Sequence, residues 1–374
     1  MKLNSMHGFW KQLKQQCKDT GQPFFVLAPM ADVTDISFRL AVAKYSRKGE
    51  PAGGPDVLWT EFVSADGLIL GGKESLIKDL QFDESERPIV AQLFGSNPET
   101  MRKASKLVAE LGFDGIDINM GCPDKSIERQ GAGAAMMKNP PSAVDIISAV
   151  KTGIADAGKI IPVSVKTRVG YNNLEIETWI PLLLKQNISA LTVHARTRKE
   201  LSKVPARWEL LKRVVEIRDV VAPETLIIGN GDITDIALGK LRAKQSGVDG
   251  IMIGRSALGN PWIFDEGSVI KETILSIPRF ISSLLPSAWV KKLKGERKYT
   301  VVNKTKEERI EALLYHAQLF DKYLKDHKNF SVLKKHIKAY INGFQGAKEM
   351  RVEIFDTVNS YAELKQYFEG KKTQ

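Results

Sequence analysis

The sequence predicts an α/β protein, a parallel (β/α)8 TIM barrel followed by a small all-α C-terminal domain. The first observation is that short apolar runs alternate with amphipathic stretches up to residue 264. The second is that these runs are apolar throughout, which is typical of strands buried on both faces of a parallel sheet. The third is that the alternation stops after residue 264 and helical patterns follow. Eight such units over roughly 240 residues match the size of a closed barrel.

The eight predicted strands are short, and most end in or next to a polar residue or a glycine. A doubly wound open sheet is the rival fold. It would normally place a glycine-rich fingerprint after its first strand, and Ala28-Pro29-Met30-Ala31 is not one. The predicted strands are Phe24–Ala28, Val57–Thr60, Ile89–Leu93, Gly115–Asn119, Val163–Lys166, Ala190–His194, Leu226–Asn230 and Gly250–Gly254.

Helix signals separate the strands. Asn97, Pro98 and Glu99 read as an N-cap, a first-turn proline and a first-turn acid, and Gly112 is a stop signal. Similar segments begin at Pro141-Ser142 and span Trp208 to Val221.

The chain is predicted to divide into three parts: a catalytic barrel over residues 1–265, a linker or insertion over 266–304, and a helical domain over 305–374. The insertion carries the basic run Lys291–Lys294. Thr305 to Glu308 forms a capping box that opens a helix. Further helices are predicted around 334–338 and 362–368.

Composition indicates a basic intracellular protein. The chain has 55 Lys+Arg against 44 Asp+Glu, a net charge of +11, which suits a polyanion such as RNA. A basic soluble protein without such a partner has nearly the same composition. Cys17 and Cys122 are the two cysteines, and we see neither a signal peptide nor a membrane span. We therefore expect a cytoplasmic monomer that contacts no membrane and no DNA.

Polar residues gather at the C-terminal ends of the predicted strands. In a (β/α)8 barrel this face carries the active site, because strand ends and βα-loops converge there. One such residue would mean little, but six are hard to assign to packing. They are Gln92, Asn119, Lys166, His194, Asn230 and Arg255.

Cys122 follows the fourth strand between Gly121 and Pro123, on a turn with a restricted backbone. A free cysteine is by default a small buried hydrophobe, but a strand's C-terminal end favours a functional role. An ordinary thiol, with a pKa of about 8.5, is mostly protonated at neutral pH. It can therefore donate a proton as a general acid. The sequence supplies no adjacent base that would make it a nucleophile.

Two glycine-containing loops, Gly229–Asp232 and Ile253–Arg255, follow strands seven and eight. Barrels often bind phosphate there, since glycines let backbone N–H groups approach the anion and arginine adds a bidentate charge. This predicts a phosphate-bearing cofactor and no metal. Lys166 is a fixed cation for a reduced flavin or an oxyanion, or else the ion-pair partner of a carboxylate such as Asp117.

Taken together, several motifs resemble those of tRNA-dihydrouridine synthases, in order over about residues 23 to 264. The resemblance implies FMN, NADPH as reductant, and a barrel followed by a helical tRNA-binding domain. The motifs are Ala28–Ala31 with Thr34-Asp35, Ala91–Leu93, Asn119–Pro123 with Lys125 and Gly131–Gly133, Lys166–Arg168, His194–Thr197, Asn230–Asp232 and Gly254-Arg255.

The resemblance also implies roles for single residues. Cys122 protonates C5 of uracil while reduced FMN delivers hydride to C6. Along the isoalloxazine lie Pro29, Met30 and Ala31, and its polar edge meets Gln92, Lys166 and His194. The ribityl phosphate is held by Asn230, Gly231, Asp232, Gly254 and Arg255. Contacts to the flipped uridine or nearby phosphates come from Asn119, Lys125, Arg168 and Arg196.

Two departures from the family pattern stand out: Ala195 replaces a frequent glycine, and the stretch from Glu266 to Asn303 is long. Three alternatives remain open. One is an FMN barrel that reduces a free pyrimidine. Another is an RNA-binding module without turnover. The third is an aldolase-like barrel with a Schiff base on Lys166.

Overall fold

The computed structural model describes residues 8–266 and 304–372. In this part of the chain, one sheet contains eight parallel strands in the order β1-β8-β7-β6-β5-β4-β3-β2. The strands are β1 (Phe24–Leu27), β2 (Leu58–Ser64), β3 (Ile89–Phe94), β4 (Gly115–Asn119), β5 (Val163–Arg168), β6 (Ala190–His194), β7 (Leu226–Asn230) and β8 (Gly250–Ile253).

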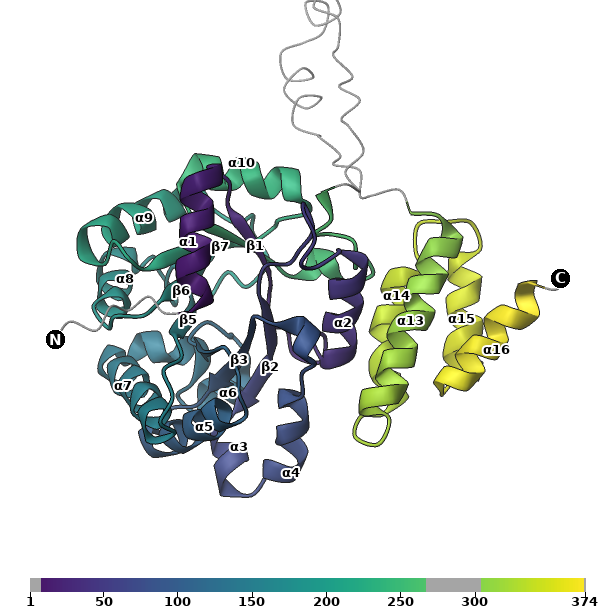
Figure 1. The fold of residues 1–374 in the computed structure, drawn as a ribbon, viewed down its shortest axis with the longest axis horizontal. Coiled ribbons are helices and arrows are strands. Elements are labelled where there is room, and N and C mark those ends of the chain that lie inside the picture. The colour runs from purple at the N-terminus through teal and green to yellow at the C-terminus, as the bar shows by residue number, and fades with distance from the viewer. Residues whose placement is uncertain (1–7, 267–303, 373–374) are drawn as a thin grey trace, which may run out of the picture.

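The sheet curls round so that its two edge strands meet. Val26 and Val57 form a parallel bridge, and the Leu27 N–H donates to the Val57 carbonyl at 3.3 Å. Helices surround the strands (Figure 1). The (β/α)8 barrel is therefore confirmed, with α2 (Ile36–Tyr45), α3 (Ala65–Leu70), α4 (Lys73–Leu76), α5 (Pro98–Glu110), α6 (Lys125–Arg129), α7 (Pro140–Asp156), α8 (Ile176–Leu184), α9 (Glu209–Val221) and α10 (Ile236–Ser246).

The predicted strands match the observed ones closely, and β4, β6 and β7 match at both ends. The largest difference is β2, which continues past Thr60 to Ser64. Its pairing with β3 shifts register between Trp59 and Phe62. The irregularity brings Glu61, a charged residue, into the strand and breaks the apolar run on which the prediction depended.

Helix α1 (Phe9–Thr20) was not predicted. Its Trp10 ring lies 6.0 Å from the rings of both Phe24 and Trp59, which stand at the N-terminal ends of β1 and β2. Trp10 is 1% exposed and clusters with the inward-facing Val26 and Ile228. Helix α1 thus packs against the barrel end opposite the strands' carboxyl ends.

Four further helices form a helical domain over residues 304–372, which lies beside α2 (Figure 1). Its core is shared with the barrel, because Ile36, Leu40 and Ala41 of α2 and Trp262 belong to the same buried cluster as its own side chains. The helices are α13 (Lys306–Leu324), α14 (Lys334–Tyr340), α15 (Ala347–Thr357) and α16 (Tyr361–Lys372). The sequence patterns indicated α13, α14 and α16 but not α15.

Both predicted N-caps are present. The Asn97 side chain accepts from the Glu99 N–H at 2.9 Å, and Thr305 and Glu308 form the reciprocal capping box. The segment opened by Pro141-Ser142 in the prediction begins at Pro140. Nearly all of the predicted 266–304 insertion, including Lys291–Lys294, lies outside the described residues. Within residues 8–266 and 304–372, none of the helices combines the length and apolar character required to cross a membrane.

Candidate active site

The carboxyl ends of β4 to β7 bring the predicted polar residues together. Strand register pairs Asn119 with Lys166, Arg168 with His194, and His194 with Asn230. These side chains therefore lie at one mouth of the barrel, next to the turn that carries Cys122. This is the face where (β/α)8 barrels place their chemistry.

The Cys122 turn is held from two sides. The Asn119 side-chain oxygen accepts from the backbone N–H groups of Cys122 at 2.9 Å and Gly121 at 3.1 Å. The Arg168 Nε donates to the Gly121 carbonyl at 2.7 Å. The Cys122 thiol is half-buried, and burial raises its pKa above the ordinary value. At neutral pH it is therefore a protonated thiol, suited to donating a proton.

Behind the turn runs a chain of buried hydrogen bonds. The Asn119 Nδ2 donates to Gln92 Oε1 at 3.2 Å, and the Gln92 Nε2 donates to Asp117 Oδ2 at 2.6 Å. The Ser164 hydroxyl donates to Asp117 Oδ1 at 2.5 Å. Burial raises the pKa of Asp117 to about 6, so it is mostly ionised at pH 7. The chain links a buried charge to the backbone of Cys122.

Lys166 lies among these groups and is half-buried. Its ammonium donates to Asn230 Oδ1 at 3.4 Å. Burial and, next, the nearby Arg168 lower the pKa of Lys166 to about 8, which leaves it mostly cationic at pH 7. The alternative ion pair with Asp117 is absent among the ion pairs of the described residues. Lys166 thus presents a cation at the barrel mouth.

His194 is neutral and its tautomer can be assigned. Burial, followed by the charges of Arg168 and Lys166, lowers its pKa well below the ordinary value. The Arg196 Nη1 lies 3.2 Å from the His194 Nε2. Because a guanidinium can only donate, Nε2 accepts and the proton is on Nδ1. His194 therefore presents an N–H donor beside Asn230.

The loop after β7 centres on a carboxylate between two arginines. Asp232 forms ion pairs with Arg196, whose side chain is buried, and with Arg255, at 3.2 Å for the latter. Two guanidinium groups on one carboxylate leave net positive charge. Gly231 adopts φ +127°, and a Cβ there would lie 2.8 Å from the Ala206 Cβ, so this position requires glycine.

This donor set fits a phosphate-bearing flavin. Arg255 is 65% exposed, so its guanidinium can still meet an anion from solvent. Gly254 leaves room beside Met30, since a Cβ there would meet the Met30 Sδ at 3.5 Å. Lys166 and the His194 Nδ1–H add donors toward the barrel mouth.

The remaining predicted residues vary in exposure. Pro29 is buried, Met30 is half-buried and Ala31 is exposed, on the loop after β1. Lys125 is exposed at the start of α6. Arg196 is buried, with its Nε donating to the Val204 carbonyl at 2.6 Å.

Sequence reasoning named Asp117 only as an alternative ion-pair partner of Lys166, and it gave Ser164 no role in the site. A signal was available for Asp117, because it is charged within an apolar run and shares a strand face with Asn119 two residues later. Ser164 has no comparable signal, since a buried serine in a strand is ordinary.

Comparison with known proteins is consistent with this geometry. The family model for dihydrouridine synthase (Dus) matches residues 26–372. The "Probable tRNA-dihydrouridine synthase 2" of Bacillus subtilis (strain 168) is 40% identical over 352 residues, covering 93% of this chain and 92% of the relative. The "Probable tRNA-dihydrouridine synthase" of Staphylococcus aureus (strain COL) is 37% identical over 369 residues, covering 98% and 96%. The chain therefore belongs to the dihydrouridine synthases, a family of oxidoreductase enzymes.

Proposed function

We propose that this enzyme reduces specific uridines in tRNA to 5,6-dihydrouridine, with bound FMN as the flavin and NADPH as the reductant. The substrate follows from the names of its relatives and suits a net charge of +11. Cys17 and Cys122 are both free, which suits a reducing cytoplasm. We further propose that the enzyme acts there as a monomer and that its helical domain contacts the tRNA.

The flavin would be held at the carboxyl ends of the strands. When bound and reduced, FMN supplies the hydride that uracil receives at C6. Lys166 and the His194 Nδ1–H would face the polar edge of the ring, where a cation and a neutral donor would stabilise negative charge. Gln92 already bonds Asp117 and Asn119, which leaves one of its amide hydrogens for the same edge. The ring would pack on Pro29, Met30 and Ala31, and the phosphate would meet Asn230, Gly231, Asp232, Gly254 and Arg255.

Cys122 supplies the proton that C5 of uracil receives, which balances the hydride at C6. The observation that carries this role is the turn itself. Asn119 fixes the backbone of Cys122, and burial keeps its thiol protonated. The transferred proton leaves a thiolate, which the nearby charges of Arg168 and Lys166 stabilise.

The target base must leave its stack to reach the barrel mouth, which costs a few kcal/mol and favours unpaired loop positions. Lys125 is exposed and would contact a phosphate near the target base. Asn119, Arg168 and Arg196 are buried. Asn119 and Arg168 would therefore act mainly through the Cys122 turn, and Arg196 through His194 and Asp232.

The first prediction concerns Cys122→Ala. Mass spectrometry of unmodified tRNA incubated with enzyme and NADPH should show a gain of two hydrogens at a defined uridine. Loss of the general acid should slow this gain by about 10²- to 10⁴-fold. Cys17→Ala is the matched control, because Cys17 lies at the opposite end of the barrel, where its thiol donates to the Asp249 carbonyl.

Three outcomes separate the proposal from its rivals. No mass gain on any unmodified tRNA, or equal rates for Cys122→Ala and wild type, would contradict it. Reduction of free uridine at a comparable rate would favour an enzyme of free pyrimidines.

A further inference from the structure

The loop between β1 and α2 is a tight turn. The Met30 N–H donates to the Thr34 hydroxyl at 2.9 Å, and the N–H groups of Val33 and Thr34 both donate to the Met30 carbonyl at 3.1 Å. Asp32 adopts φ +53°, in the left-handed region that non-glycine residues rarely occupy. Such a conformation persists only where surrounding contacts hold it.

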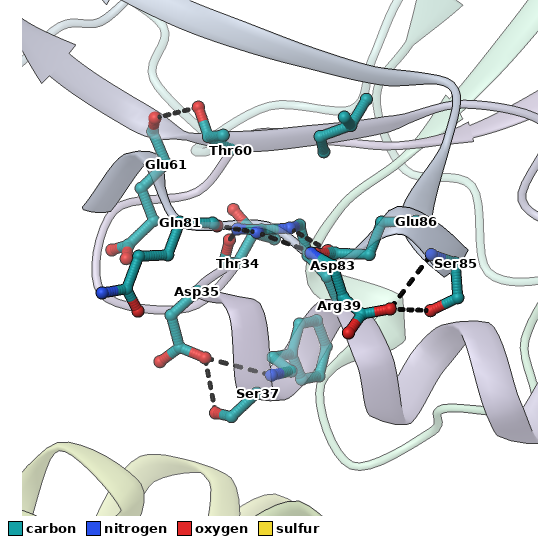
Figure 2. Close-up of polar contacts among 12 residues, drawn as sticks. Thr34, Asp35, Ser37, Arg39, Thr60, Glu61, Gln81, Asp83, Ser85 and Glu86 are labelled. Carbon is teal, nitrogen blue, oxygen red and sulfur yellow. Dashed lines mark hydrogen bonds and ion pairs between the residues drawn. The ribbon is translucent and has the colours of Figure 1, made fainter. Parts of the chain in front are cut away.

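Glu61 holds this strained residue from the barrel side. Its Oε1 accepts a hydrogen bond from the Asp32 N–H. The Glu61 side chain is 7% exposed and comes from the irregular part of β2. Figure 2 shows Glu61 close to Thr34 and Asp35 at the start of α2.

The other oxygen of Glu61 is bound by the helical domain. The Lys328 ammonium donates to Glu61 Oε2 at 2.6 Å and lies 2.9 Å from Asp79 Oδ1. Lys328 follows α13, where its backbone N–H bonds the Leu324 carbonyl, and its side chain is 16% exposed. A single half-buried cation thus joins the helical domain to two segments of the barrel.

The negative charge on Glu61 depends on the positive charge of Lys328. Burial raises the pKa of Glu61, and Lys328 opposes that rise, while Asp35 and Asp79 add negative charge nearby. Without Lys328, Glu61 would be a buried carboxyl beside two others and would take up a proton. A neutral carboxyl is a weaker acceptor for the Asp32 N–H than a carboxylate.

Two more contacts reach the same loop. The His316 Nε2 lies 3.2 Å from the Ser37 hydroxyl, which donates at 2.6 Å to Asp35, the N-cap of α2. The Lys335 ammonium lies 4.0 Å from Asp32 Oδ2. In Figure 2, Asp35 and Ser37 face the pale yellow-green helix of the helical domain.

We infer that Glu61 and Lys328 are a positioning pair through which the helical domain sets the loop that holds the flavin. The inference rests on the proposed function, because it takes Pro29 to Ala31 as the flavin wall. The helical domain then serves both the cofactor and the RNA. Removing the pair should weaken FMN binding even when no RNA is present.

The test titrates the full-length chain, stripped of flavin, with FMN and follows quenching of flavin fluorescence. Lys328→Met and Glu61→Gln should each raise the dissociation constant for FMN by about 5-fold or more, the lower range of typical coupling between sites. The double variant should match the single variants rather than multiply their effects. Lys325→Met is the matched control, since Lys325 is 57% exposed and contacts only Asp321 among the described ion pairs.

Lys328→Arg keeps the charge and should restore most of the affinity, which a general loss of folding would not allow. Hydrogen exchange over residues 28–35 should rise in Lys328→Met and not in Lys325→Met. Unchanged FMN affinity in Lys328→Met, or a loss of affinity for tRNA only, would overturn this inference and leave the proposed function intact. If the wild-type chain itself fails to bind FMN, the proposed function fails and takes the inference with it.

Discussion

At the scale of single residues, the charge on Asp117 determines which way two buried amides point. An ionised carboxylate only accepts hydrogen bonds, so Gln92 must turn its NH2 group toward Asp117. The Gln92 oxygen then meets the Asn119 NH2 group, and the Asn119 oxygen meets the Cys122 N–H. An uncharged partner at position 117 could donate instead and reverse this order, leaving the Cys122 N–H facing an NH2 group.

We therefore predict that Asp117→Asn lowers kcat for uridine reduction by about 10- to 100-fold, as expected when a reacting group is misplaced. KM for tRNA and reduction of the flavin by NADPH should change little. Because Asp117 must be ionised, the wild-type rate should fall as pH falls through about 6, its raised pKa. Rapid-mixing kinetics at a series of pH values would measure this fall in rate. The Asp117→Asn variant should not show it.

Asp145→Asn, on the exposed face of α7, is the control. Normal kcat in Asp117→Asn would exclude the orienting role.

The stability of the fold should depend on pH in the opposite direction to the activity, falling where the activity rises. Since the folded pKa lies above the ordinary 3.8, ionisation of Asp117 costs stability as pH rises from there to about 6.

The sequence located the polar residues at the carboxyl ends of the strands because each interrupts an apolar pattern there. Their partners could not be located in this way. Glu61 and Lys328 are 267 positions apart, and neither local propensity nor periodicity encodes that contact. Likewise, the pairing of Arg196 and Arg255 with Asp232 depends on how three loops fold together.

At the scale of elements, α1 shows how little apolar surface a helix needs to seal one end of a barrel. Trp10 and Leu13 are its buried residues, while most of its other positions face solvent. The Trp10 ring packs beside Phe24 and Trp59 at the N-terminal ends of β1 and β2. The contact is far from Cys122 and should affect stability rather than chemistry.

Trp10→Ala should lower the free energy of unfolding by about 3–5 kcal/mol, the usual cost of emptying a buried tryptophan site. Urea denaturation would measure the loss. The exposed neighbour Lys11→Ala should cost almost nothing. A Trp10→Ala loss below about 1 kcal/mol would show that α1 does not seal the barrel.

The strands were predictable because burial on both faces makes them continuously apolar. Helix α1 was not, because Phe9, Trp10, Leu13 and Cys17 are spaced among lysines and glutamines. Because these four residues fall on one face of a helix, their spacing was a signal from which α1 could have been predicted. Helix α15 was missed for a related reason, since charged residues separate its buried Met350 and Ile354.

At the scale of the whole molecule, the sequence suggested a barrel and a separate helical domain, but their cores are continuous. Helix α13 packs on α2, and Ile36, Leu40 and Trp262 lie in the helical domain's own cluster. A Cβ on Gly259 would lie 2.4 Å from the backbone of Ala339, so the backbones of the barrel and the helical domain are in close contact at this point. No local pattern reports which outer barrel helix serves as the base of another domain.

A fragment of residues 304–374 should therefore not fold alone. Each barrel side chain missing from its core removes about 1.5–3 kcal/mol of stabilisation by apolar burial. A core this small rarely supplies more than about 3–5 kcal/mol of net stability. Circular dichroism should show weak helicity and no cooperative melting, in contrast to the intact chain. Cooperative unfolding of the isolated fragment would contradict the shared core.

The shared core also determines where the chain can be cut and recombined. A chimera that joins this barrel to another family member's helical domain at residue 304 would place foreign side chains on Ile36, Leu40 and Trp262. It would also lose the partner of Glu61 unless the donor carried a lysine at the place of Lys328. A workable graft would take the outward face of α2 along with the incoming helices, so the unit of exchange is larger than the boundary in the sequence suggests.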